Sequence, residues 1–415
     1  MNRRSFIAAG IGSSVLTGGS YGAATSSLPT SLQPGTNSIR SLFPRARQEV
    51  HLNAAGGTPL STFAEEGLKR YQDFWRWGPS QGRADYPRQV QSEIRGLFAG
   101  LIGADAEEIG LIHCTKAGEQ IVLDSLPAFR SGGNVVSNDL HFGGSLHNLI
   151  GLRQAGHDVR IVRNRNWKID PAEMEGAMDG KTALLAIALL SNLNGHLEDI
   201  RRLSDRVHAL GGYVYADIIQ AAGIYPLVMR EMGIDFAACS GYKWLFGPHG
   251  CGFFYVRKEL QGSVLPDRVF PGHSQPNYAP FVRQVATGQP DYRYRAPIDG
   301  RRYQPGHISY LGYAALYEGL KFLSHVGVEA ALRHSLELNQ HLKEQLDPRR
   351  FPCLSPHWES TPIITFGTDD PEGLTNRLQS AGVVVSMSNN RFRVSPAVYN
   401  TKTDMEQLAS VLKAG

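Results

Sequence analysis

The sequence predicts an α/β fold built on a mainly parallel sheet. Between residues 110 and 260, short apolar runs alternate with amphipathic stretches. Most of these runs are apolar on both faces, as strands are in a sheet that is covered on both sides. Strand–helix–strand alternation of this kind favours parallel pairing. The expected strands are Gly110–Thr115, Asn134–Asn138, Val159–Val162, Ala183–Leu190, Tyr213–Ala216, Phe236–Cys239 and Cys251–Val256.

Helical periodicity predicts the remaining elements. A helix is expected at 62–77, and long helices are expected at 309–346. Residues 361–415 predict a small α/β unit with a terminal helix, whereas residues 25–48, rich in Ser, Pro and Gly, predict a surface lead-in. Ligands of such sheets bind beyond the carboxyl ends of the strands, so functional residues are expected there. Helices between the strands are expected at Glu119–Ala128, Ser145–Gln154 and Ile200–Leu210.

The first 24 residues are expected to be a signal rather than part of the fold. Arg3-Arg4 precedes a weakly hydrophobic, uncharged run, and Gly22-Ala23-Ala24 offers small residues for cleavage. This pattern predicts a twin-arginine export signal, the twin-arginine translocase as a partner and a periplasmic location. The run is too short for a transmembrane helix, so stable membrane insertion is not expected. The alternative is a frayed N-terminus with a chance arginine pair.

Composition and motifs exclude several other functions. The net charge of +4 falls to +2 without the two signal arginines (4 minus 2), which favours no nucleic-acid partner despite the basic–aromatic stretch Tyr292–Arg295. No G-x-G-x-x-G follows a strand, and neither a P-loop nor an H-E-x-x-H motif is present, so a nucleotide-dependent oxidoreductase is disfavoured. The histidines show no metal spacing, and the four cysteines show no C-x-x-C pair. We therefore expect neither a metal site nor a disulfide.

An acid and a lysine end two successive apolar runs. Asp217 follows Tyr213–Ala216, and Lys243 follows Ser240-Gly241-Tyr242 in a stretch rich in small residues. A carboxylate and an amine at neighbouring strand ends are what pyridoxal 5′-phosphate (PLP) requires, the amine as Schiff-base partner and the acid to keep the pyridine nitrogen protonated. Taken alone, Asp217 could instead cap a helix with Gln220 at its third position, and Lys243 could be an exposed lysine.

Asp217-x-x-Gln220 and Ser240-x-Tyr242-Lys243, followed by glycines, resemble the class V aminotransferase family of fold-type I PLP-dependent enzymes. The resemblance implies a large domain with a mainly parallel seven-stranded sheet and a smaller α/β C-terminal domain. It implies that Lys243 forms the Schiff base, that Asp217 pairs with the pyridine nitrogen and that Gln220 reaches the phenolic oxygen. Ser240 and Tyr242 are expected near the phosphate.

Other segments resemble the family in order and position. His141, after the 134–138 run, is the ring-stacking candidate, with a surface turn histidine as the alternative. Asn192 matches the residue that contacts the phenolic oxygen. Ala117 and Gly118 lie in the expected phosphate turn at a helix N-terminus, with Gly118 where a threonine is usual. Arg393 is expected to grip a substrate carboxylate, with an exposed strand arginine as the alternative.

Two loops bear on assembly and reaction. Gly306-His307 resembles the loop that reaches the partner subunit's phosphate, with His307 in place of a threonine, which implies a homodimer. The stretch 384–390 is short and lacks the cysteine that desulfurases carry before the final arginine motif. Persulfide-forming desulfuration is therefore not expected, and the isopenicillin N epimerase-like branch is closer.

The expected organisation is a signal at 1–24, an N-terminal lead-in at 25–60 that joins the small domain, a large PLP-binding domain at 61–300 and a C-terminal small domain at 301–415. The expected function is α-carbon chemistry on an amino acid or peptide-like substrate: transamination, epimerisation or elimination. Export suggests, more narrowly, tailoring of the acyl glutamate side chain of a pyoverdine-type siderophore. A non-catalytic exported binding protein is the remaining alternative.

Overall fold

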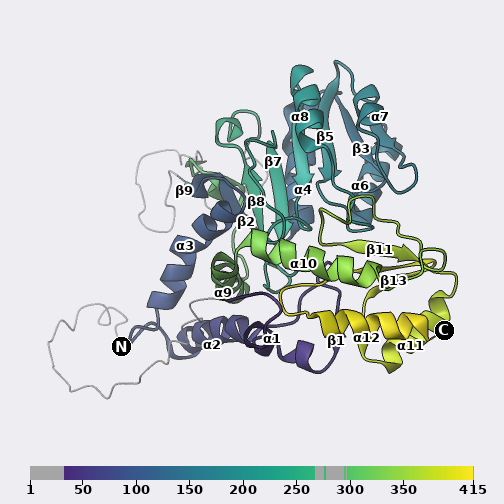
Figure 1. The fold of residues 1–415 in the computed structure, drawn as a ribbon. Helices are drawn as coiled ribbons and strands as arrows, with labels where there is room; N and C mark the ends of the chain where they lie inside the picture. The colour runs from purple at the N-terminus through teal and green to yellow at the C-terminus, as the bar shows by residue number, and fades with distance from the viewer. Residues whose placement is uncertain (1–31, 267–274, 277–293, 296, 415) are drawn as a thin grey trace, which may run out of the picture. The chain divides into compact units, whose positions relative to one another are not determined.

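A computed structural model describes residues 32–266, 275–276, 294–295 and 297–414. Its central feature is a seven-stranded sheet in the order β2-β8-β7-β6-β5-β3-β4 (Figure 1). The five strands from β7 to β4 pair in parallel, whereas β8 is antiparallel to both β7 and β2. The predicted α/β class with a mainly parallel sheet is therefore confirmed. The strands are β2 (Ile109–Ile112), β3 (Asn134–Asn138), β4 (Val159–Val162), β5 (Thr182–Ala188), β6 (Tyr213–Asp217), β7 (Phe236–Ser240) and β8 (Gly252–Val256).

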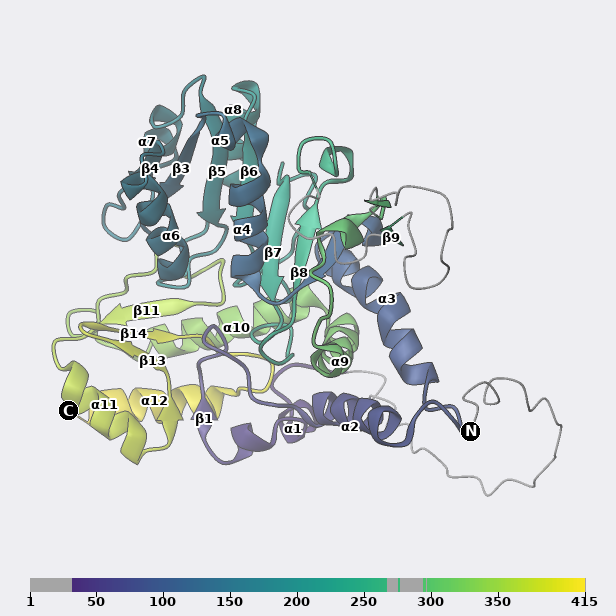
Figure 2. The same cartoon turned by 180° about the vertical axis from the view of Figure 1, so that it is seen from behind.

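Helices cover both faces of this sheet, as continuous apolar strands require. Every residue of β5, β7 and β8 is buried. Helices α4 and α6 contact each other on one face, and α7 and α8 contact each other on the other (Figures 1 and 2). The helices are α1 (Asn37–Ser41), α2 (Thr62–Trp77), α3 (Asp85–Leu101), α4 (Thr115–Ser125), α5 (Pro127–Arg130), α6 (Gly143–Gln154), α7 (Pro171–Gly176), α8 (Ile200–Ala209), α9 (Tyr310–Val326), α10 (Val328–Lys343), α11 (Pro371–Ser380) and α12 (Lys402–Lys413).

A second, smaller core lies toward the C-terminus. A three-stranded antiparallel sheet, in the order β11-β14-β13, packs with α10, α11 and α12 around Leu342, Phe366 and Phe392. Strand β1 pairs in parallel with β12, so a segment near residue 50 joins this C-terminal core. The strands are β1 (Val50–His51), β11 (Ile364–Gly367), β12 (Val383–Val384), β13 (Ser386–Ser388) and β14 (Arg391–Val394). A further short pair, β9 (Gln275–Pro276) with β10 (Tyr294–Arg295), is antiparallel.

One expectation needs correction. From residue 32 onward the expected surface lead-in is anchored in the fold: Phe43 is fully buried, with its ring 4.7 Å from that of Tyr399 and 6.0 Å from that of Phe322. The contacts of the Phe43 ring thus anchor this segment in the fold, although most of the residues around Phe43 are polar. The helix expected at Glu119–Ala128 is α4, which spans Thr115–Ser125 and so begins at the expected phosphate turn. The expected signal at 1–24 and most of the stretch 292–295 lie outside the described residues, and none of the described helices is long and apolar enough to cross a membrane.

Candidate active site

Asp217 and Lys243 meet at the carboxyl edge of the parallel strands. Asp217 is the last residue of β6, and Lys243 lies three residues beyond the end of β7, which pairs with β6. Both side chains are buried, with exposed fractions of 4% and 6%. They line a cavity of about 110 Å³, which we call the lysine cavity, together with Cys114, Thr115, Lys116, Phe142, Ile219, Ser240 and Tyr242. The reading of Lys243 as an exposed lysine is therefore wrong.

Burial shifts the proton affinity of both groups. It lowers the pKa of Lys243 from 10.5 to about 8, and Arg393 adds to this effect while Asp217 opposes it. Burial raises the pKa of Asp217, while the neighbouring His141, the Ile219 N–H, which donates to Asp217 Oδ1 at 3.0 Å, and Lys243 oppose this rise. Among the described residues no ion pair within 4.0 Å includes either Asp217 or Lys243. The cavity thus separates a carboxylate from an amine that is readily deprotonated.

The N-terminus of α4 is tied directly to the end of β7. The Thr115 N–H donates to Ser240 Oγ at 2.8 Å, and the Ser240 N–H donates to Thr115 Oγ1 at 2.9 Å. Ala117 follows in the first turn of this helix, where backbone N–H groups and the helix dipole favour an anion such as a phosphate. A Cβ on Gly118 would lie 2.6 Å from Ala238 Cβ. Gly118 therefore faces the sheet, and its position has no room for the side-chain donor that a threonine would supply.

Two predicted cofactor residues have partners within the protein. Gln220 Nε2 donates to the Ala55 carbonyl at 3.0 Å, and Gln220 Oε1 accepts from Trp244 Nε1 at 3.0 Å. Gln220 is thus held rigidly behind Asp217 with one amide hydrogen to spare. The Tyr242 ring stacks on His249 at 4.0 Å and lies 5.6 Å from Lys243 Nζ, where it lines the cavity.

His141 is a buried residue and not the surface turn histidine of the alternative reading, since only 1% of it is exposed. Its Nδ1 accepts a hydrogen bond from the Phe142 N–H at 2.8 Å. Its Nε2 lies 3.5 Å from Glu119 Oε1, a contact that the sequence did not predict. Glu119 stands four residues after Thr115 on α4, so a helix beginning at Thr115 places both on one face.

Arg393 on β14 turns toward the same site from the C-terminal core. Its Nη1 donates to the Asn192 carbonyl at 2.6 Å, and its Nη2 donates to Asn53 Oδ1 at 2.9 Å. It is 9% exposed, and no ion pair in the described part of the chain includes it. Burial, with help from Arg391, lowers the pKa of Arg393 to about 10. A buried guanidinium held by neutral groups alone is suited to bind an anion.

Unsatisfied polar atoms mark the space that a cofactor and substrate would fill. Asn192 Oδ1 and Arg393 Nε are buried without a hydrogen-bond partner in the described structure. Buried polar atoms normally have partners, so these two point to groups that bind there. A carboxylate, an amine and an anion-binding helix end fit the ring nitrogen, aldehyde and phosphate of PLP.

The remaining predicted residues lie apart from this cavity. Gly306 and His307 are exposed and do not line it, so their contact with a partner subunit stays a prediction. Strands β13 and β14 are joined by a tight turn at Asn389-Asn390, which holds no cysteine. All four cysteines are free. Cys114 lines the lysine cavity, because it is the residue before α4.

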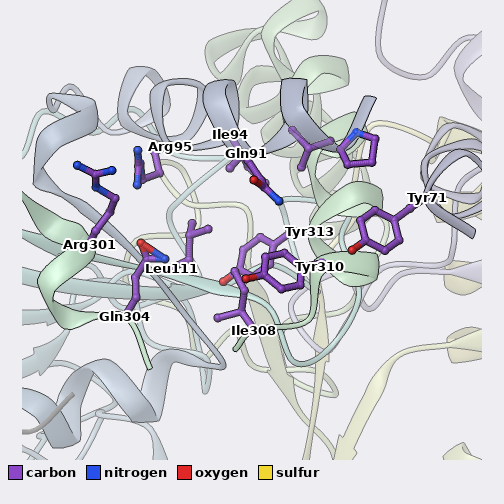
Figure 3. A pocket seen from close by; sticks show the side chains of 12 residues that line it. Tyr71, Gln91, Ile94, Arg95, Leu111, Arg301, Gln304, Ile308, Tyr310 and Tyr313 are labelled. Carbon is purple, nitrogen blue, oxygen red and sulfur yellow. The ribbon is translucent and has the colours of Figure 1, made fainter. Parts of the chain in front are cut away.

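A second cavity, of about 200 Å³, lies between α3 and the start of α9, and we call it the tyrosine cavity. Figure 3 shows Arg95 and Arg301 at one end of it and Tyr71 at the other. Its polar groups include the side chain of Gln304, which is 3% exposed. No aspartate, glutamate, lysine or cysteine lines it, so it lacks a nucleophile or base of the Lys243 kind.

Comparisons with known proteins bear on the family and the fold. The family model described as "Aminotransferase class-V" matches residues 82–408. A probable cysteine desulfurase of Methanothermobacter thermautotrophicus is 25% identical, over 91% of this chain and 97% of the relative. An uncharacterized aminotransferase, YcbU, of Bacillus subtilis is 22% identical, over 90% and 96%. Among solved structures, the apo cysteine desulfurase from Thermococcus onnurineus has a TM-score of 0.79 at 18% identity, over 92% of this chain and 98% of that one. The cystine C–S lyase C-DES, in complex with cysteine persulfide, has a TM-score of 0.76 at 20% identity, over 90% and 99%.

Proposed function

The chain belongs to the class-V aminotransferase family, and from this premise we propose that it is a PLP-dependent enzyme that acts at the α-carbon of an amino acid or an amino-acid-containing substrate. The observation that carries this proposal is the buried pair of Lys243 and Asp217, which face one cavity without forming an ion pair. Burial of two opposite charges without direct pairing costs stability. A group that binds between them supplies the missing partners.

Each residue then has a distinct task. Bound PLP supplies an electron-accepting ring that stabilises negative charge at the substrate α-carbon. Asp217 holds a proton at the ring nitrogen. Lys243 is the covalent anchor, and once released it is the base that takes or returns a proton at the α-carbon, since a pKa of about 8 leaves roughly one lysine in ten neutral at pH 7.

Arg393 orients the substrate. Its guanidinium can bind a carboxylate through two parallel N–H groups. Fixing the carboxylate would set how the α-carbon is oriented toward the bound cofactor, and so which of its bonds the cofactor would weaken. Transamination, epimerisation and elimination all begin from this arrangement.

The turn between β13 and β14 argues against persulfide transfer by a loop cysteine. Its two residues, Asn389 and Asn390, offer no thiol. A C–S bond can still be broken by elimination without an enzyme thiol, which is compatible with the fold shared with the cystine C–S lyase. Elimination from a sulfur-containing amino acid therefore stays within the proposal.

A covalent-trapping experiment tests the proposal. The purified protein is incubated with PLP, reduced with borohydride, digested and analysed by mass spectrometry. We expect the cofactor mass on the peptide that contains Lys243, and its loss in Lys243→Ala. Lys116→Ala is the matched control, because Lys116 also lines the cavity and its loss should leave the attachment intact. A wild-type protein without bound PLP, or label on another lysine, would refute the proposal.

Export and assembly extend the proposal. We propose that Arg3-Arg4 directs the chain to the periplasm and that the enzyme is a homodimer in which Gly306 and His307 reach the partner's phosphate. Export together with the family supports a narrower substrate, the acyl glutamate side chain of a pyoverdine-type siderophore. Incubation of the mature enzyme with ferribactin-type precursors tests this idea, and precursors that emerge unchanged would contradict it.

A further inference from the structure

The side chain of Glu119 is an unusual neighbour for His141. Both residues are 1% exposed, and Glu119 lies in a helix interior, where a carboxylate away from water is costly. Glu119 Oε2 accepts from Ser145 Oγ at 2.9 Å and lies 3.3 Å from Lys116 Nζ. Glu119 Oε1 has no hydrogen-bond partner and faces His141 Nε2 at 3.5 Å. One carboxylate oxygen is thus anchored, and the other is left for the histidine.

The state of the anchored carboxylate follows from its surroundings. Burial by itself would raise the pKa of Glu119, but His141, Lys116 and Ser145 together lower it below its ordinary value. Glu119 is therefore ionised at neutral pH and acts as an acceptor only. It can receive a hydrogen from His141 and cannot donate one.

The other side of the imidazole is fixed by the backbone. The Phe142 N–H donates to His141 Nδ1 at 2.8 Å, so Nδ1 must offer a lone pair and carry no hydrogen. The ring hydrogen then resides on Nε2, which points at Glu119. A hydrogen on Nδ1 would oppose the Phe142 N–H, so the two contacts select the same tautomer from opposite sides of the ring.

We propose that Glu119 is a positioning residue that fixes the Nε2–H tautomer and the ring plane of His141, with Ser145 and Lys116 holding the carboxylate in place. The inference rests on the proposed function, in which His141 belongs to the PLP site. Asp217 on β6 also acts electrostatically on His141, and the charge of Glu119 in turn raises the pKa of Asp217. Asp217 faces the reacting groups, whereas Glu119 approaches from α4 and contacts His141 directly. Glu119→Gln and Glu119→Leu both remove the charge of Glu119, so a difference between these two variants reports the contact with His141.

Ring ¹⁵N NMR of the cofactor-free protein tests the proposal without reference to activity. The His141 signals are assigned by their loss in His141→Asn. We expect one tautomer, protonated at Nε2, in the wild type. Glu119→Gln should keep it, because the amide oxygen offers an acceptor at the same position facing Nε2–H, whereas Glu119→Leu should give a mixture of tautomers. Unchanged His141 shifts in Glu119→Leu would overturn the proposal.

Kinetics give the second readout. Partners that orient a functional histidine typically change activity by about 10–100-fold. We expect kcat to fall by this factor in Glu119→Leu with KM within about threefold, and Glu119→Gln to restore most of it. Glu108→Gln is the matched control, because Glu108 is also buried but bonds to Arg230 and to the Lys258 backbone.

Two further outcomes distinguish failure of this proposal from misfolding of a variant and from failure of the proposed function. If Glu119→Leu does not fold, Ser145→Ala weakens the same anchor with a smaller change, and unaltered His141 shifts in that variant would count against the proposal. If the wild type shows the single tautomer but binds no PLP, the proposed function fails while the contact between Glu119 and His141 stands.

Discussion

The lysine cavity and the tyrosine cavity differ in whether their charged side chains are buried and whether they form ion pairs. In the lysine cavity, Asp217 and Lys243 are almost fully buried and form no ion pair with any described residue. In the tyrosine cavity, Arg301 is half-exposed and paired with Asp299. The buried and unpaired charges thus lie in the smaller of the two cavities, which has a volume of about 110 Å³ against about 200 Å³.

This difference shows that volume is a poor guide to chemistry in this protein. Charges that are buried and unpaired lower stability, and they persist where a ligand or reaction uses them. An open cavity whose charged side chains remain partly exposed needs no such explanation. The comparison predicts that changes in the lysine cavity and its Arg393 neighbour alter binding, pH dependence and stability strongly, and that changes in the tyrosine cavity do not.

Loss of Arg393 is expected to have the largest effect. Its carboxylate partner would be the substrate, and two charge-assisted hydrogen bonds contribute about 3–4 kcal/mol, so Arg393→Ala should raise KM roughly 10²–10³-fold. The measurement is amino acid binding followed by the absorbance of bound PLP. L-alanine and ethylamine, which differ by the carboxylate, should bind with similar affinity in the variant but not in the wild type.

Arg391→Ala provides the control for this prediction. Arg391 lies two residues away on β14, with its guanidinium 5.1 Å from the Trp167 ring. We expect it to change KM by less than about threefold. An equal rise in KM in both variants would show that Arg393 contributes only to the general positive potential. The two cavities would then differ less than proposed.

Much of this contrast was predictable, because strands leave a periodic signal. Seven apolar runs located the strands of the main sheet, and the helical stretches between them predicted mainly parallel pairing, which holds from β7 to β4 but not for β8. Asp217 and Lys243 were found because each ends such a run. Arg393 was placed through a motif on a later strand, since nothing local in the sequence shows that β14 faces the carboxyl edge of a different sheet.

The second largest effect is expected on stability. It comes from burial of the charged Lys243 side chain. Its pKa is about 8 in the folded protein against 10.5 when unperturbed. Below pH 8 it is charged in both states, so folding carries the full cost of burying the cation. Between pH 8 and 10.5 the unfolded chain binds more protons than the folded one, so wild-type stability rises with pH. In cofactor-free protein, Lys243→Met should therefore be more stable than wild type at pH 7, by on the order of 3 kcal/mol.

Urea denaturation at pH 7 and pH 10 measures this difference. The advantage of Lys243→Met should shrink at the higher pH. Lys69→Met, at an exposed position of α2, controls for the added apolar side chain and should change the free energy of unfolding by less than about 0.5 kcal/mol. An advantage for Lys243→Met that is equal at both values of pH would mean that Lys243 is not a buried cation in solution.

What the sequence could not supply was long-range contact between side chains. The pairing of Glu119 with His141 depends on α4 beginning at Thr115, ahead of the amphipathic run that starts at Glu119. The role of Cys114 as a cavity residue depends on the same boundary. Phe43, in a polar segment, packs against the rings of Tyr399, Phe246 and Phe322, which lie far along the chain, as well as against Phe63. Helix ends and distant packing are where local patterns carry the least information.

The smallest effect is expected in the tyrosine cavity. Arg95 lines it on α3, and burial lowers its pKa only in part, because Asp299 lies near enough to oppose the shift. Arg95→Gln keeps the length of the side chain and removes the charge. A half-buried charge without strong partners contributes little, so the free energy of unfolding should change by less than about 0.5 kcal/mol and kcat/KM by less than about threefold. Denaturation and steady-state kinetics on the same preparation measure both. If the free energy of unfolding is unchanged, a loss of activity as large as that of Arg393→Ala cannot come from unfolding. It would then mean that the tyrosine cavity also contributes to the reaction.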